Sequence, residues 1–192
     1  MEHDEQTDDL AEEALRLALG GAEEARIRRM ASIFLGQSGG STSSVEALAA
    51  ALRDPDKTVR AEAVRSLVAC GPTGFPVLLA ALRDPDWRVR YRAAEGLGLL
   101  GERRAVAPLL RALTDEREHV RYMAAKALGL IADPAARAAL LPLLRDPNPP
   151  ARKAAATALG AIGGAEDALE AALADEPSGA VRRAVRDALG RS

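Results

Sequence analysis

Apolar positions along most of the chain follow a spacing of four residues. In one segment Val89, Ala93 and Leu97 stand four residues apart, and the same order of an apolar residue, a small residue and a leucine recurs further along the chain. Residues spaced by four and eight lie on one face of an α-helix. The pattern therefore predicts amphipathic helices whose apolar stripe faces a core. A glycine follows most of these leucines, as at Gly129 and Gly160, and is expected near the end of each helix.

The helical pattern belongs to a longer repeat. The tetrapeptide Leu-Arg-Asp-Pro occurs at residues 52–55, 82–85 and 144–147, with degenerate copies at 113–116 and 173–176. After each copy comes an apolar residue followed by Arg, and successive pairs of this kind are 30, 31, 31 and 30 residues apart. Ile27-Arg28 begins the same pattern 32 residues before Val59-Arg60, which brings the number of repeats to six.

Each repeat is expected to form a helical hairpin. A more apolar segment, such as residues 106–113, precedes the striped helix, and the Asp of each Asp-Pro pair suits an N-cap followed by proline. One hairpin cannot bury its own apolar stripe, so the copies are predicted to stack into a right-handed α-solenoid. Five residues after the apolar member of each pair, the last repeat alone carries a charged residue, Arg186. This difference indicates a terminal repeat that faces solvent.

Composition agrees with an all-α fold. The chain of 192 residues contains 42 alanines and only five aromatic residues, a balance that favours closely packed helices over a β-sandwich. A single cysteine, Cys70, excludes an internal disulfide and a cysteine metal cluster. The sequence contains no run of 18 apolar residues and no leader-like start, so we expect a cytoplasmic protein without membrane contact.

Charge is unevenly distributed along the chain. The net charge is −2, but residues 1–13 carry seven acids and no base. The rest of the chain therefore holds 26 bases against 21 acids. We expect residues 1–8 to form a flexible acidic tail.

Two segments carry a resemblance to a known family. Asp-Pro-Asp-Trp-Arg-Val-Arg-Tyr-Arg-Ala-Ala-Glu-Gly-Leu-Gly at 84–98 and Arg-Tyr-Met-Ala-Ala-Lys-Ala-Leu-Gly at 121–129 resemble the HEAT-like repeats of the phycobilin (PBS) lyase type. The resemblance covers about residues 9–191 and implies one HEAT-like repeat domain at 9–192. The implied repeats span about residues 9–37, 44–71, 75–101, 104–132, 134–163 and 165–191.

The resemblance also implies a structural ladder between adjacent repeats, in which the acid of each turn pairs with the Arg after the apolar residue. The implied acids are Asp54, Asp84, Asp115, Asp146 and Asp175. The implied bases are Arg60, Arg90, Arg121, Arg152 and Arg182. Partly shielded ion pairs of this kind fix the register of neighbouring repeats more than they add net stability.

The sequence holds no persuasive pattern for catalysis, a metal or a cofactor. Gly96, Gly98 and Gly101 satisfy Gly-x-Gly-x-x-Gly, but they stand at the end of an expected helix and not between a strand and a helix. His3 and His119 are the only histidines, too few for the several His-Glu pairs of the HEAT-like hydroxylases that resemble this fold. We therefore expect no catalytic residue, no metal site and no cofactor.

Residues that differ between repeats at fixed helix positions are the candidates for binding. Counted from the apolar member of each apolar-Arg pair, positions −2, −1, +2, +3 and +6 lie off the core stripe, and the resemblance places them on the concave side of the solenoid. The expected partner-binding residues are Trp87, Arg88, Tyr91, Arg92, His119, Tyr122, Met123, Lys126 and Lys153. Across the six repeats these positions hold nine bases and four acids. Aromatic and arginine side chains on an exposed patch are typical of interface hot spots, although such side chains also serve only to cover neighbouring helices.

These observations favour a non-enzymatic scaffold that binds a protein or peptide of acidic character on this face. Nucleic-acid binding is one alternative, because HEAT-like solenoids resembling DNA-repair glycosylases grip duplex on a basic concave face, but a pI near 5.8 disfavours it. A bilin lyase-like accessory role is the other alternative, and it rests on the resemblance alone.

Overall fold

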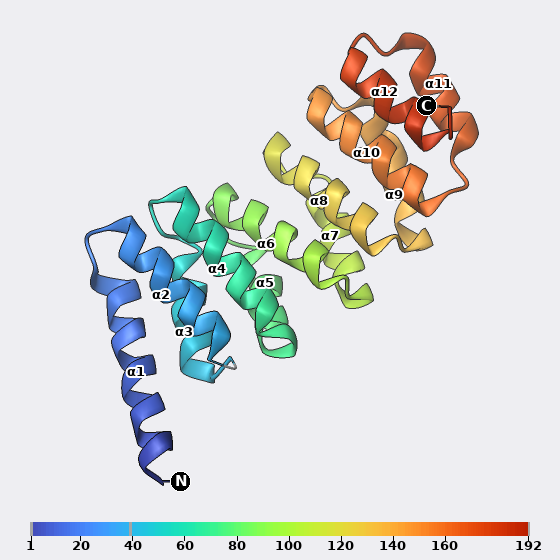
Figure 1. Ribbon diagram of the computed structural model, residues 1–192. Coiled ribbons are helices and arrows are strands. Elements are labelled where there is room, and N and C mark those ends of the chain that lie inside the picture. The colour runs from blue at the N-terminus through green and yellow to red at the C-terminus, as the bar shows by residue number, and fades with distance from the viewer. Residues whose placement is uncertain (1, 39, 192) are drawn as a thin grey trace. The chain divides into compact units, whose positions relative to one another are not determined.

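The regular elements of the described chain are all helical (Figure 1). This computed structural model describes the backbone of residues 2–38 and 40–191, and the side chains from residue 12 onward within these ranges. The chain folds into two compact units, residues 1–96 and 97–192, and the boundary between them falls inside helix α6.

Helices of the first unit pair into hairpins, and we call the first helix of each hairpin A and the second B. The three hairpins are α1 (Glu2–Gly21) with α2 (Ala25–Gln37), α3 (Thr42–Ala51) with α4 (Lys57–Ala69), and α5 (Gly74–Ala81) with α6 (Trp87–Leu100). A 3-10 turn, η1 (Gly71–Thr73), leads into α5. The B helices α2 and α4 pack against each other.

The second unit continues the same alternation after the end of α6. Its hairpins are α7 (Val106–Ala112) with α8 (Glu118–Ile131), α9 (Arg137–Leu140) with α10 (Pro149–Ile162), and α11 (Glu166–Asp175) with α12 (Gly179–Ala188). The 3-10 turns are η2 (Arg103–Ala105), η3 (Pro134–Ala136) and η4 (Leu141–Arg145), and η4 extends α9. The B helix α10 packs between α8 and α12 (Figure 1). The predicted fold class, an all-α solenoid of HEAT-like helical hairpins, is confirmed.

The predicted apolar stripe forms the core of the B helices. Val120, Ala124 and Leu128 are each fully buried, and the equivalent residues of α4 and α10 are buried in the same way. At the fifth position after the start of the stripe, the first five repeats carry buried side chains, whereas Arg186 of α12 is exposed. The interpretation of α12 as a solvent-facing terminal B helix is therefore confirmed.

Most glycines after the stripe leucines do not mark the helix ends, contrary to the prediction, whereas Gly190 follows the C-cap of α12 with a φ of 69°, as predicted. Gly129 and Gly160 lie inside α8 and α10, which end at Ile131 and Ile162. A Cβ atom at Gly160 would lie 2.7 Å from the Cβ of Ala188 in α12, and one at Gly129 would lie 2.9 Å from the Cβ of Ala158. These glycines are needed because consecutive B helices approach closely there.

The aspartates before proline do not cap the B helices, which is a second correction. The N-cap of α4 is Asp56, whose Oδ1 accepts the N–H of Thr58 at 2.7 Å. Asp54 instead accepts the N–H of Asp56 at 2.8 Å, and so closes the turn that precedes the cap. The same carboxylate also faces the neighbouring repeat, where Arg28 binds it.

The acidic N-terminal segment is part of α1. Residues 2–8 of the predicted flexible tail 1–8 form the first turns of this helix, and their side chains, like the whole of residue 1, lie outside the described residues. Near the middle of α1, Glu12 accepts hydrogen bonds from the hydroxyls of Ser43 and Ser44 at 2.9 and 2.8 Å, and also from Ser41. The Ser41 hydrogen bond is the main cause of the lowered pKa of Glu12. The flexibility of residues 1–8 and the single repeat domain at 9–192 stay predictions.

Among the described residues, no single helix is long and apolar enough to cross a bilayer. The pair Lys57–Ala69 and Gly71–Ala81 reaches the required length and hydropathy only when joined, across a bend of 118°.

Candidate protein-binding face

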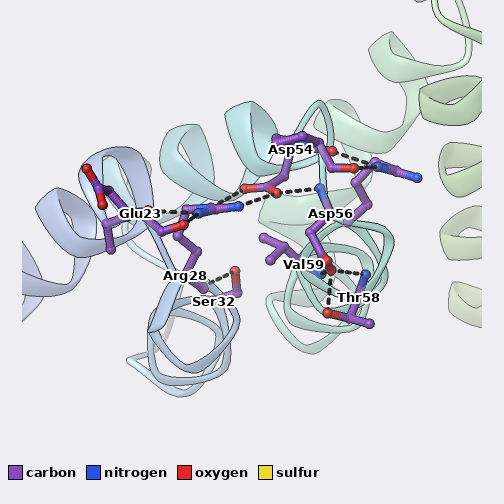
Figure 2. A network of polar contacts seen from close by, with 10 residues as sticks. Glu23, Arg28, Ser32, Asp54, Asp56, Thr58 and Val59 are labelled. Atoms are coloured by element: carbon purple, nitrogen blue, oxygen red, sulfur yellow. Dashed lines mark hydrogen bonds and ion pairs between the residues drawn. The ribbon is translucent and has the colours of Figure 1, made fainter. Parts of the chain in front are cut away.

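Arg28, Arg121 and Arg152, which follow the stripe residue, each connect their hairpin to the next. Arg28 of α2 donates from Nε and Nη2 to the carboxylate of Asp54, at 2.7 and 3.0 Å. Its Nη1 donates to the carbonyl oxygens of Ala22 and Glu23 in its own turn. Figure 2 shows Arg28 between these two turns. One guanidinium thus sets the spacing of two adjacent turns.

The same arrangement recurs in the second unit. Arg121 donates to Asp146 at 2.6 and 3.1 Å, and its Nη1 binds the carbonyl oxygen of Asp115 at 2.9 Å. Arg152 donates to Glu176 at 2.7 and 2.8 Å. We call each pair of an arginine and a carboxylate from adjacent turns a rung. The acid predicted for this last rung, Asp175, is exposed, and the prediction is wrong because Arg152 binds Glu176 instead. The acids that bind these arginines, Asp54, Asp146 and Glu176, each stand directly before proline, and in the sixth repeat Glu-Pro at 176–177 takes the place of Asp-Pro.

Other implied ladder residues hold their own turn. The Nη1 atoms of Arg60, Arg90 and Arg182 each bind the carbonyl oxygen of the rung acid in the same repeat, at 2.7, 2.9 and 2.8 Å. Within the described residues, Arg60 Nε is buried without a hydrogen-bond partner. Asp84 is bound by Arg53 from the preceding turn.

Electrostatics of the rungs favour the ionised carboxylates. Burial alone would raise the pKa of Asp146, but hydrogen bonds from Arg121 and from the N–H of Asn148 outweigh it, so the pKa is lowered. The pKa of Glu176 is lowered mainly by the hydrogen bond from Arg152. A carboxylate with a lowered pKa stabilises the fold above its usual pKa and loses that contribution as the pH falls through it.

A pair of isosteric changes tests the corrected rung. Glu176→Gln is expected to lower the free energy of unfolding by about 1 kcal/mol, because it removes the charge that Arg152 binds while keeping the shape. Asp175→Asn, one residue away and exposed, is expected to leave stability unchanged. Urea denaturation of both variants at neutral pH measures the difference. Equal losses in the two variants would contradict the assignment of Glu176 to the rung.

Predicted binding residues of the first unit lie at the start of α6. The guanidinium of Arg88 lies 5.6 Å from the centroid of the Trp87 ring, and that of Arg92 lies 5.4 Å from the Tyr91 ring. Arg92 also pairs with Glu95 at 2.5 Å. The four predicted residues therefore form two cation–π pairs on adjacent turns of one helix.

In the second unit, His119, Tyr122 and Lys126 lie on α8, and Lys153 lies on α10. His119 and both lysines are exposed, and Tyr122 is half-buried. His119 Nδ1 lies 3.9 Å from a carboxylate oxygen of Glu118.

Met123 is a correction, because its side chain is buried and only 3% exposed. The residues at the same repeat position in α10 and α12, Ala154 and Ala184, are buried as well. One helical turn further on, Ala158 lies against Gly129 of the preceding B helix. In α10 and α12 position +3 therefore faces the packed interior and not solvent, whereas Arg92 at this position in α6 is half-buried.

Two exposed leucines were missed by the sequence analysis. Leu130 near the end of α8 is 55% exposed, and Leu99 near the end of α6 is 53% exposed. Leu130 stands four residues after Lys126 and eight after Tyr122, so all three lie along one side of α8. Extending the helical spacing by one further turn would have found it.

A groove between α10 and α12 continues this face. Its volume is about 380 Å³, and Lys153, Thr157, Arg183 and Asp187 line it together with small residues such as Gly160. Lys126, Lys153 and Arg183 are exposed, and within the described chain none of them has an ion-pair partner. We call Tyr122, Lys126, Leu130, Lys153 and Arg183 the B face of the second unit.

Side chains of catalytic or metal-binding type are not gathered on this face. Among the described residues, no group of three or more His, Cys, Asp or Glu side chains could hold a metal ion. Gly96 and Gly98 lie inside α6, without the strand that a dinucleotide motif requires. Burial raises the pKa of the Cys70 thiol, which disfavours the reactive thiolate.

Solved structures similar to the chain are helical repeat proteins. The complex of CpcE and CpcF of phycocyanin lyase from Nostoc sp. PCC7120 is 24% identical, covers 78% of this chain and 99% of that chain, and has a TM-score of 0.70. The YIBA_ECOLI structure is 20% identical, covers 97% of this chain and 70% of that chain, and has a TM-score of 0.62. A computationally designed armadillo repeat protein for modular peptide recognition is 20% identical, covers 93% and 98%, and has a TM-score of 0.57. At these identities the likeness concerns the fold, which defines the class as an α-helical repeat solenoid.

Sequence comparison places the chain within this class. HEAT repeats match residues 75–144 and 115–190, more than half of the chain, so the protein belongs to the HEAT repeat family. This result and the likeness to the phycocyanin lyase complex confirm the predicted resemblance to HEAT-like repeats of the PBS lyase type. A comparison with curated protein sequences finds no match.

Proposed function

We propose that this protein is a non-enzymatic scaffold and that the B face of the second unit binds an acidic segment of a partner protein. The observation that carries the proposal is a group of three exposed cations that have no ion-pair partner among the described residues, Lys126, Lys153 and Arg183, beside the exposed Leu130 and the half-buried Tyr122. These residues come from three consecutive B helices that pack side by side.

The chemistry of the face suits a segment that is acidic and partly apolar. Tyr122 and Leu130 offer apolar surface that a partner side chain would remove from water, which supplies most of the affinity at protein interfaces. The three cations attract carboxylates and speed the encounter, with an effect that weakens as salt increases. Two carboxylates, those of Glu118 and Asp187, border the same face. Because the three cations outnumber them, the face repels a strongly basic partner.

The start of α6 is a second contact surface in this proposal, described for the first unit by itself. Trp87 and Tyr91 provide aromatic area, and Arg88 and Arg92 lie over the two rings. Aromatic and arginine anchors of this kind dominate the binding energy of many interfaces. Because Glu95 pairs with Arg92, this surface attracts acids less strongly than the B face of the second unit.

The fold supports a binding role and gives no support to a particular chemistry. The designed armadillo repeat neighbour was made for modular peptide recognition, and its fold likeness is consistent with a peptide-binding scaffold. The likeness to a phycocyanin lyase complex concerns the fold, and no residue of the described chain assigns a bilin to this protein. A net charge of −2 disfavours the nucleic-acid alternative.

Charge reversal on the B face is expected to abolish partner recovery. The double variant Lys153→Glu with Arg183→Glu turns the groove acidic without touching a buried residue. Affinity purification of the tagged protein from its native cells, followed by mass spectrometry, measures which proteins are recovered. We expect the specific partners of the wild type to fall at least tenfold in the variant, because like charges then oppose the acidic segment.

A matched control separates this face from charge in general. Arg111→Glu with Arg145→Glu reverses two exposed arginines in α7 and η4 of the same unit, away from the B helices. This control is expected to recover the same partners as the wild type. Loss of partners in both double variants, or in neither, would contradict the assignment to the B face. Loss of bound nucleic acid without a change in bound protein would favour the nucleic-acid alternative.

A further inference from the structure

Helix α2 exposes a row of large apolar side chains. Ile27, Met30 and Phe34 are each 46% exposed. They are spaced by three and four residues, so they lie along one side of the helix. This apolar edge is separate from the B face of the second unit and takes no part in the proposed function.

The same positions are covered in the later B helices. In α4, the residues that correspond to Met30 and Phe34 are Glu62 and Ser66, and both are buried. Ser66 is the residue that a Cβ at Gly36 of α2 would meet at 2.6 Å, so this side of α4 packs on the preceding B helix. The exposed side of α2 is therefore a helix-packing surface, in register with the internal interface between B helices, that no B helix of the described chain covers.

The opposite end of the repeat array does not complement this edge. End-to-end stacking of two copies would place α12 of one copy on α2 of the other. The outward position of α12 holds the exposed Arg186, and covering its guanidinium with Ile27, Met30 and Phe34 would bury a charge without a partner. A contact between two copies that uses the same surface twice avoids this cost and closes into a dimer.

We infer that the apolar edge of α2 is the contact surface for a second copy of this chain, with the two α2 helices antiparallel about a twofold axis. In an antiparallel pair centred on the middle of this row, Ile27 of one copy lies against Phe34 of the other. The two Met30 side chains then lie next to the twofold axis.

Charge selects the antiparallel orientation. The charged residues of α2, Arg26, Arg28 and Arg29, all lie in its first half. Arg28 and Arg29 are paired with Asp54 and Glu62, so a parallel pair would bring the two Arg26 side chains of the copies together. In the antiparallel pair each basic half lies beside the uncharged second half of the other helix, whose C-terminus carries the negative end of the helix dipole.

The dimer is expected to be weak and dependent on concentration. Three half-exposed side chains on a 13-residue helix cover much less than the ~800 Å² per partner of a standard stable interface. The dissociation constant is therefore expected on the order of micromolar or above. Sedimentation velocity of the full chain from about 1 to about 200 μM spans this range.

Two variants of equal chemistry test the contact. Phe34→Glu is expected to leave the protein monomeric at every concentration, because it places two carboxylates in the dimer contact. Leu141→Glu changes another exposed apolar residue, 37% exposed in η4, and is expected to dimerise like the wild type. Circular dichroism verifies that both variants keep their helices, since both changes are at exposed sites.

The orientation has its own readout. In a Cys70→Ser background, Met30→Cys is expected to form a disulfide-linked dimer with an added thiol oxidant such as diamide, because the twofold axis places the two new thiols together. Gln37→Cys, at the far end of α2, is expected to stay largely monomeric. A wild type that is monomeric up to the highest concentration, or a dimer that survives Phe34→Glu, would overturn the proposal, and neither result bears on the B face of the second unit.

Discussion

Replacing Arg121 with alanine is expected to lower the free energy of unfolding by about 2 to 3 kcal/mol. The guanidinium binds the carboxylate of Asp146 in the next hairpin and the carbonyl oxygen of Asp115 in its own. Both charged side chains are largely buried, at 16% and 6% exposure. Without Arg121 the Asp146 carboxylate stays buried and keeps only the N–H of Asn148 as a described partner. Urea denaturation at neutral pH measures the loss.

The pH dependence separates this ion pair from simple loss of packing. The pKa of Asp146 is lowered in the folded protein, so its contribution is present above the usual aspartate pKa of about 4 and is lost as the pH falls below it. The difference in stability between wild type and Arg121→Ala is therefore expected to shrink as the pH is lowered from about 6 to about 3. A difference that stays constant over this range would mean that Arg121 acts through packing alone.

A surface arginine from the same hairpin serves as control. Arg117 is 58% exposed on its side chain, and its nearest acid, Glu116, lies 3.9 Å away and is itself exposed. Arg117→Ala is expected to change stability by less than about 0.5 kcal/mol. An equal loss of stability in both arginine variants would show that the ion pair between Arg121 and Asp146 stabilises the fold no more than an exposed arginine does.

The hairpins and their buried stripe could be predicted from sequence because they depend on local periodicity. An apolar residue every four positions identifies the buried side of one helix without knowledge of its neighbours. Val120, Ala124 and Leu128 are buried for this reason. The spacing of the Asp-Pro sites similarly identified the turns, since a repeated turn must recur once in each hairpin.

Features that depend on contacts between helices were harder to predict. Position +3 is off the stripe within a single helix, yet Met123, Ala154 and Ala184 are buried, and in α10 this side of the helix faces the preceding B helix. The rung acid was assigned to Asp175 by aligning the residues after leucine, although the acid that binds Arg152 is the one before proline, Glu176. In both cases the missing information is which residue of the adjacent repeat lies opposite.

The second large change in stability is expected at Gly160, where two B helices approach closely. Gly160→Ala is expected to lower the free energy of unfolding by about 1 to 3 kcal/mol, because the new methyl would lie 2.7 Å from the Cβ and 2.8 Å from the backbone Cα of Ala188. The backbone of α12 must move to make room, so we expect faster hydrogen exchange in α12 as well.

Gly20 in α1 offers the same chemical change without the contact. A Cβ there meets no atom within 4 Å, and the residue is helical. Gly20→Ala is therefore expected to raise the free energy of unfolding by about 0.5 to 1 kcal/mol through the better helix propensity of alanine. Thermal denaturation of the two variants should give shifts of opposite sign. A stabilising Gly160→Ala would mean that α10 and α12 move apart at this contact without cost.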